Sequence, residues 1–169
     1  ASDVYKRQSL FTVVGPTHAK LHLGGPKPWS WILASMTAGM LIAVAATLKY
    51  KPRRPIFVGI LAQVFVGLWW LALGTTEFIP VLLLGALAAG FAMDFFMVLW
   101  MTTLQKQIPK ESLSRVSSYD AFGSLILAPL GIVVAGPLVN KFGTVAVLHV
   151  YTVAFFMVLF IILSVRSVR

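Results

Sequence analysis

Long apolar stretches separated by short polar connections dominate the chain. Each has about the twenty residues that an α-helix needs to cross the hydrocarbon core of a bilayer. The apolar runs are continuous, whereas strands of a membrane barrel alternate in polarity over about ten residues. The pattern therefore predicts an all-α membrane protein, a helical bundle with about five transmembrane helices. The expected spans are Trp29–Leu48, Ile56–Leu73, Phe78–Leu104, Ser117–Val139 and Thr144–Val165.

Residues 9–28 fit this pattern less simply. Leu10–Gly15 is apolar but too short to span, so we expect the stub of a preceding helix. The run Gly24-Gly25-Pro26 favours an external loop after that stub. The loop would carry His18, Lys20, His22 and Lys27. Ala1–Gln8 resembles a translated sequencing-adapter scar and is set aside, so we expect natural sequence to be missing before Ser9.

Composition agrees with a lipid environment. Hydrophobic residues make up 59% of the 169 residues and charged residues 11%, against about 25% charged in soluble domains. The net charge of +9 would suggest a nucleic-acid partner in a soluble chain. Here the basic residues lie in short segments between the apolar stretches, so we expect no nucleic-acid partner. Cysteine is absent, which excludes disulfides and thiolate sites.

The basic residues are unevenly divided between the two sides of the predicted bundle. One side carries nine of them, and the other carries three, namely Lys20, Lys27 and Lys141. Positive charge is retained on the cytoplasmic side of membrane proteins. We therefore expect a multi-pass membrane protein with a cytoplasmic C-terminus. The nine are Lys49, Lys51, Arg53, Arg54, Lys106, Lys110, Arg115, Arg166 and Arg169.

Asp94 is the acidic residue that falls inside the third predicted span. A carboxylate at this depth is costly unless it faces a cavity or has a partner. It is a candidate for proton coupling or cation recognition, and the alternative is a structural acid bonded to a neighbouring helix. Phe91, Met97 and Met101 share its helical face, and Gln63 is a further candidate. For Gln63 a hydrogen bond between helices is the simpler expectation.

A second group of candidates lies at the basic side. Asp120 can stabilise the first turn of its helix or form a gate latch with Arg115 or the Arg53/Arg54 loop; Gln105 lies near them in sequence. His18 and His22 have a spacing that can suit zinc on a helix. A third ligand is not near them in sequence, so we expect no metal and no cofactor.

Several short segments together resemble a known family. They are Leu99-Trp100-Met101-Thr102-Thr103-Leu104-Gln105, Ile108-Pro109, Ser114-Arg115-Val116-Ser117-Ser118-Tyr119-Asp120, Pro129-Leu130-Gly131 and Ala135-Gly136-Pro137-Leu138. The chain resembles the major facilitator superfamily, in the branch of bacterial drug and siderophore exporters that includes the enterobactin exporter. The resemblance implies twelve helices in two halves, in the inner membrane of a bacterial cell. Residues 9–28 would then be the end of helix seven and an external loop, and residues 29–169 helices eight to twelve.

The resemblance also implies a function. It suggests an antiporter that couples proton flow to efflux of a small amphipathic compound, drug or siderophore-like, together with an N-terminal six-helix half. Two other readings stay open. The chain can be a non-transporting membrane subunit, or an intramembrane hydrolase using Ser124 and His149. The chain lacks the Gly-x-Ser-x-Gly turn typical of serine hydrolases, so we expect that it is not an enzyme.

Overall fold

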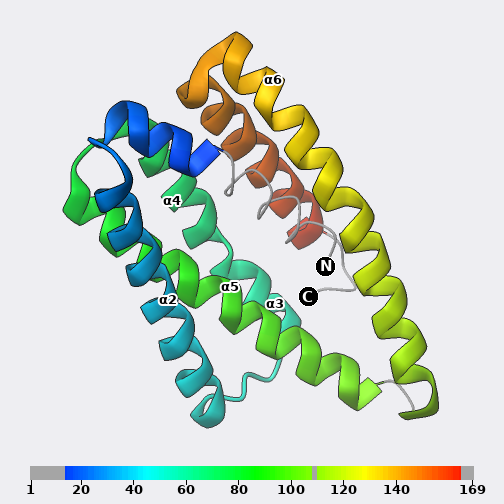
Figure 1. The fold of residues 1–169 in the computed structure, drawn as a ribbon. Helices are drawn as coiled ribbons and strands as arrows, with labels where there is room; N and C mark the ends of the chain where they lie inside the picture. Colours follow the sequence, from blue (N-terminus) through cyan, green and yellow to red (C-terminus); the bar gives the residue numbers. More distant parts are fainter. Residues whose placement is uncertain (1–13, 108–109, 165–169) are drawn as a thin grey trace.

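Long α-helices lying side by side make up the architecture (Figure 1). The structure is a computed structural model and describes residues 14–107 and 110–164. The side chains of residues 110–136, apart from Ser118, fall outside the description, as does the predicted scar Ala1–Gln8. Four described helical segments are long and apolar enough to cross a membrane: Pro26–Lys49, Pro55–Thr75, Ile79–Gln107 and Pro137–Ser164. The all-α membrane class expected from the sequence agrees with them.

A short helix over residues 14–22 precedes the first long one. This corrects the prediction that His18 and His22 lie in a loop. The helix ends where Gly24 and Gly25 adopt positive φ angles of 81° and 116°, a backbone region that glycine enters without steric cost. The Gly-Gly-Pro signal therefore follows the end of the short helix, which extends seven residues beyond the expected stub Leu10–Gly15.

Helix α2 (Pro26–Lys49) begins with a proline in its first turn, where the missing N–H costs nothing. Its two leading tryptophans differ in environment. Trp31 is half exposed, with Lys27 Nζ 5.6 Å from its ring centre. Trp29 is buried, and its ring lies directly against Gly15 of the short helix. Of these two tryptophans, Trp31 is therefore the one whose exposed ring can lie at a membrane–water interface.

The second predicted span is interrupted. Helix α3 (Pro55–Ala62) and helix α4 (Val64–Thr75) meet at Gln63. The Gln63 carbonyl accepts from the N–H groups of Val66 and Gly67, at 3.0 and 3.2 Å. The backbone bonds are thus kept through the irregular turn, as an apolar environment requires.

Helix α5 (Ile79–Gln107) and α2 approach each other at two glycines. A Cβ atom on Gly39 would collide with the Leu87 carbonyl, and one on Gly90 would collide with the Met36 carbonyl. Nearby, the Ser35 hydroxyl donates to the Leu83 carbonyl at 2.8 Å. Small residues permit this close contact between membrane helices. Gly85, on the same helix, faces the Trp69 ring of α4, with its Cβ position 2.8 Å from Cδ1.

Helix α6 (Lys110–Ser164) consists of two arms joined at a corner. Gly143, with φ 80° and ψ 161°, breaks the helical backbone there, and the chain turns back on itself in Figure 1. This is where the sequence predicted a turn between the fourth and fifth spans. The fourth span, Ser117–Val139, is helical in its backbone, but most of its side chains fall outside the description.

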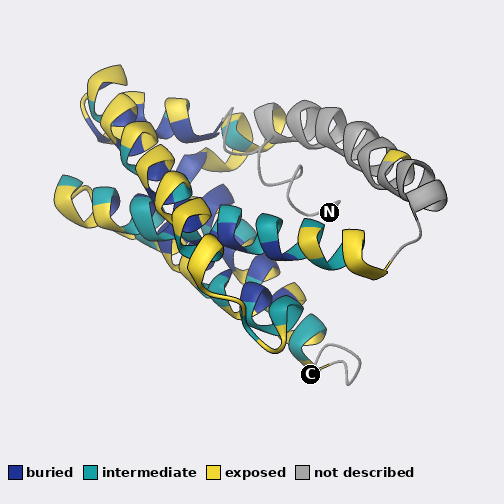
Figure 2. Cartoon of the chain, turned by 90° about the horizontal axis from the view of Figure 1, so that it is seen from below, coloured by how far each residue is buried: buried dark blue, intermediate teal, exposed yellow. Residues whose placement is uncertain are grey.

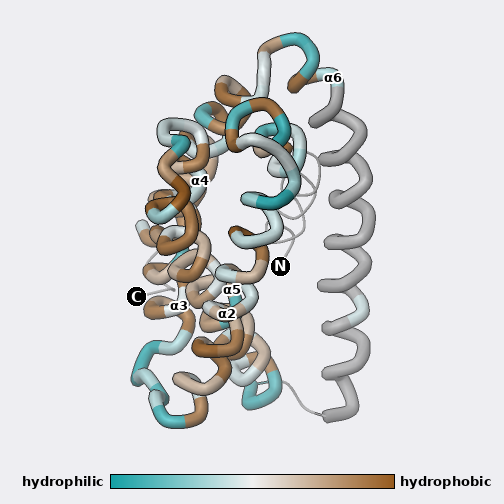
Figure 3. Tube along the Cα trace, turned by 60° about the vertical axis from the view of Figure 1, so that its left-hand side comes forward, coloured by the Kyte–Doolittle hydropathy of each residue, from teal (hydrophilic) through white to brown (hydrophobic). Residues whose placement is uncertain are grey.

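The core and the surface are both apolar. The large buried residues include Ile32, Trp69, Leu82 and Leu148. Large apolar side chains also cover the outside, with the exposed fraction reaching 76% at Leu48. Figure 2 shows exposed positions along the outer faces of the helices, and Figure 3 shows hydrophilic segments gathered near their ends. Lipid is the solvent that fits such a surface.

Candidate functional site

Asp94 lies near the middle of α5, about 20 Å from either end at 1.5 Å per residue. Its side chain is half-buried. Among the described residues, none forms a hydrogen bond or ion pair with its carboxylate. The structural alternative, an acid bonded to a neighbouring helix, therefore has no described partner to support it.

The surroundings of Asp94 on α5 are apolar. Gly90, one turn earlier, marks the close approach to α2. Phe91 stacks on Phe95 with ring centres 5.3 Å apart. Met97 and Met101 are half-buried on the following turns. The predicted candidates Phe91, Met97 and Met101 thus flank the carboxylate along one helix.

Gln63 forms a hydrogen bond between two helices. Its side chain is buried, and Nε2 donates a hydrogen bond of 2.9 Å to the Ala92 carbonyl of α5. This bond joins the α3–α4 break to the helix that carries Asp94. From the sequence, a hydrogen bond between helices was the simpler expectation for Gln63, and the structure contains this bond.

The gate candidates are only partly described. Arg53 and Arg54 are exposed in the connection between α2 and α3, and Gln105 is exposed near the end of α5. No described residue forms an ion pair with either arginine. The side chains of Arg115 and Asp120 lie outside the described residues, so the latch stays a prediction.

Two histidines of the short helix lie at the opposite end of the bundle. His18 and His22 stack with ring centres 4.5 Å apart. His18 is buried, and its Nδ1 lies 3.1 Å from the Thr144 hydroxyl of α6. His22 Nδ1 lies 3.4 Å from Glu77 Oε1. These contacts fasten the short helix to α6 and to the connection after α4.

Burial lowers the pKa of His18 from its usual 6.5, and the neighbouring His22 acts in the same direction. Glu77 and the Leu73 backbone oppose the shift. The lowered pKa favours a neutral ring, although the buried Nε2 has no hydrogen-bond partner among the described residues. Within those residues, no three histidine, cysteine or acidic side chains are grouped closely enough to bind a metal.

The hydrolase candidates are not brought together by any described contact. The Ser124 side chain lies outside the described residues. His149 is half-buried against α4, where a Cβ on Gly74 would lie 3.2 Å from its Nε2. This places His149 toward the end of the bundle that holds Glu77.

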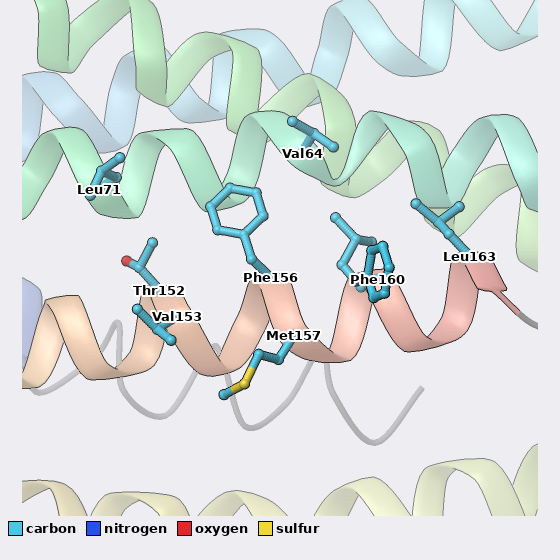
Figure 4. A pocket seen from close by; sticks show the side chains of 9 residues that line it. Val64, Leu71, Thr152, Val153, Phe156, Met157, Phe160 and Leu163 are labelled. Carbon is cyan, nitrogen blue, oxygen red and sulfur yellow. The ribbon is translucent and has the colours of Figure 1, made fainter.

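An apolar groove of about 680 Å³ runs between α4 and the C-terminal arm of α6 (Figure 4). Val64 and Leu71 of α4 face Phe156, Phe160 and Leu163 of α6 across it. The hydroxyl of Thr152 in its wall donates to the Leu148 carbonyl of its own helix, at 2.8 Å. The groove therefore suits an apolar occupant.

Comparisons with models of protein families, with curated proteins and with solved structures gave no match. The class that the fold defines is an all-α protein with apolar helices suited to a lipid bilayer.

Proposed function

We propose that the chain is part of a secondary transporter of the major facilitator type, which exports a small amphipathic compound in exchange for protons. The observation that carries the proposal is Asp94, a half-buried carboxylate near the middle of an apolar helix with no bonding partner among the described residues. Acidic residues at this depth are expensive in lipid and usually serve ion or proton pathways.

In this proposal Asp94 binds and releases the coupling proton. Phe91, Met97 and Met101 form an apolar wall beside it, and flexible methionines adapt to varied apolar substrates. Gln63 holds the helices together. The site is completed by an N-terminal six-helix half, because transporter sites lie between two repeats.

The orientation of the bundle is part of the proposal. The connection between α2 and α3 holds Lys51, Arg53 and Arg54, and α5 ends close to Lys106. The positive-inside rule favours this end as cytoplasmic. The C-terminus then lies in the cytoplasm of a bacterial inner membrane.

The test is efflux from cells that express the uninterrupted reading frame containing this chain. A panel of amphipathic dyes is loaded, and efflux is followed with and without a proton gradient. Asp94→Asn is expected to abolish gradient-driven efflux, and Asp94→Glu to retain part of it. Glu77→Gln, which removes an acid at the end of the bundle, is the matched control. Unchanged efflux and pH dependence in Asp94→Asn would contradict the proton-coupling role.

A second candidate is a non-transporting membrane subunit. The apolar groove between α4 and α6 favours it, because a helix of a partner protein can fill such a surface. Reading the upstream DNA distinguishes the two. A preceding six-helix half supports the transporter, whereas an authentic short gene supports the subunit.

A further inference from the structure

A pocket of about 540 Å³ lies at the basic end of the bundle. The end of α2, the connection that follows it, and the last turns of α5 form its walls. Lys51 comes from the connection, and Lys106 comes from α5. Thr102 and Gln107 add polar groups, while Leu48 and Val98 add apolar surface. The pocket therefore joins two cations to a partly apolar wall, and its volume is in the range of small-ligand sites.

The positive charge of the pocket has no described protein counterion. None of the described residues that line it is acidic. Of the acids with described side chains, Glu77 pairs with His22 at the other end of the bundle, and Asp94 lies three turns before Lys106 on α5. Two ammonium groups facing one pocket repel each other, so an anion bound between them would relieve the repulsion.

Helix dipoles explain only part of this arrangement. Lys49 and Lys106 lie in the last turns of α2 and α5, where a cation is stabilised by the carbonyl ends. Lys51 lies beyond the C-cap residue Tyr50, outside either helix. Its position in the wall of the pocket is therefore not accounted for by helix stability.

We propose that this pocket binds the phosphate-bearing headgroup of an anionic phospholipid. Lys51 and Lys106 contact the phosphate, Thr102 and Gln107 donate hydrogen bonds, and Leu48 and Val98 contact the start of an acyl chain. The pocket lies at the ends of two membrane-length helices, the depth at which headgroups lie, and basic pockets between such helices bind anionic headgroups. Inorganic phosphate can make the same polar contacts, but it has no acyl chain to contact the apolar wall. The inference does not depend on the transport function.

The test is native mass spectrometry of the detergent-solubilised chain with added phosphatidylglycerol or phosphatidylcholine of the same acyl chains. The wild type is expected to retain phosphatidylglycerol preferentially. The double variant with Lys51→Gln and Lys106→Gln is expected to retain phosphatidylglycerol about thirtyfold less. The matched control, Lys49→Gln with Arg53→Gln, removes two charges at the same end outside the pocket. It lowers retention only about threefold, because solvent and salt screen the more distant charges.

Further measurements separate the remaining outcomes. Lys51→Arg with Lys106→Arg is expected to keep the preference, and circular dichroism checks that every variant stays helical. If both glutamine double variants lost phosphatidylglycerol retention equally, the proposal would be overturned, since only general surface charge would then be involved. Inorganic phosphate that binds as tightly as phosphatidylglycerol would overturn the assignment to a lipid.

Discussion

Gln63 Nε2 donates a hydrogen bond of 2.9 Å to the backbone carbonyl of Ala92, two residues before Asp94 on α5. The bond lies in the buried interior of the bundle and crosses from the α3–α4 break to another helix. It ties the irregular backbone at Gln63 to the helix that holds the candidate proton site.

Gln63→Leu is expected to lower the free energy of unfolding by about 1 kcal/mol, the usual net worth of a hydrogen bond between membrane helices. Gln63→Glu is expected to cost more, because it places a carboxyl group in an apolar interior. Thermal unfolding in detergent measures both. Efflux that is lost in Gln63→Leu without a change in stability would instead assign Gln63 to substrate binding.

The α2–α5 crossing gives a second prediction. Gly39→Ala or Gly90→Ala is expected to destabilise the protein by about 1–3 kcal/mol, because the added Cβ meets a backbone carbonyl that cannot move independently. Ala45→Leu is the control, since Ala45 is an exposed position on α2. Thermal unfolding of the three variants checks the prediction. Glycine variants as stable as the wild type would show that the two helices are farther apart.

The lowered pKa of His18 makes stability depend on pH. As the pH falls through 6.5, the usual pKa of histidine, the unfolded chain takes up a proton before the folded chain does. The folded state therefore loses stability toward acid pH. His18→Gln is expected to flatten the fall in melting temperature between about pH 7.5 and 5.5.

The control for this measurement is His149→Gln, which should keep the acid sensitivity of the wild type. His18→Gln also retains a polar group that can reach Thr144. If the melting temperature of His18→Gln falls with pH as steeply as that of the wild type, His18 is not the source of the dependence.

Gly143 gives a prediction about the corner of α6. Its φ of 80° and ψ of 161° lie in a region that only glycine occupies readily. Apart from its chain neighbours, no described residue has an atom within 4 Å of its Cβ position, so the cost of substitution comes from the backbone. Gly143→Ala is expected to lower stability by about 1–3 kcal/mol.

The matched variant is Gly143→Asn. Asparagine tolerates the left-handed helical region, but a ψ of 161° lies outside it. It should therefore fail to restore stability. Thermal unfolding of both variants tests this, and a fully stable Gly143→Asn would indicate that the corner has the ordinary left-handed geometry.

The helices of this fold could largely be predicted from the sequence, because apolar length and flanking charge are local properties. The break at Gln63 could not, since it is coupled to a hydrogen bond with Ala92 on a helix almost thirty residues away. Likewise, Gly24-Gly25-Pro26 indicated a loop but not that residues 14–22 form a helix before it. The short helix depends on tertiary contacts such as Trp29 against Gly15.

The candidate site was predictable only in part. Asp94 stands out because acids are rare in apolar spans, and helical periodicity places Phe91, Met97 and Met101 near it. The close approach at Gly39 and Gly90 was missed, because glycine is common in membrane helices and its spacing does not identify the facing helix. The pocket between Lys51 and Lys106 was also missed, since the two residues are far apart in sequence and meet only where α2 and α5 end together.

The corner at Gly143 has a mechanical consequence. Helices α2 and α5 are joined backbone to backbone, and the Gln63 amide fastens α3 and α4 to them. At the corner, a Cβ atom on Gly143 would meet no described atom within 4 Å, whereas the Thr144 hydroxyl next to it contacts His18 of the short helix. Because the helical backbone is interrupted only at Gly143 in the described part of α6, we expect a deformed bundle to bend between the two arms of that helix, while helices α2 to α5 move together.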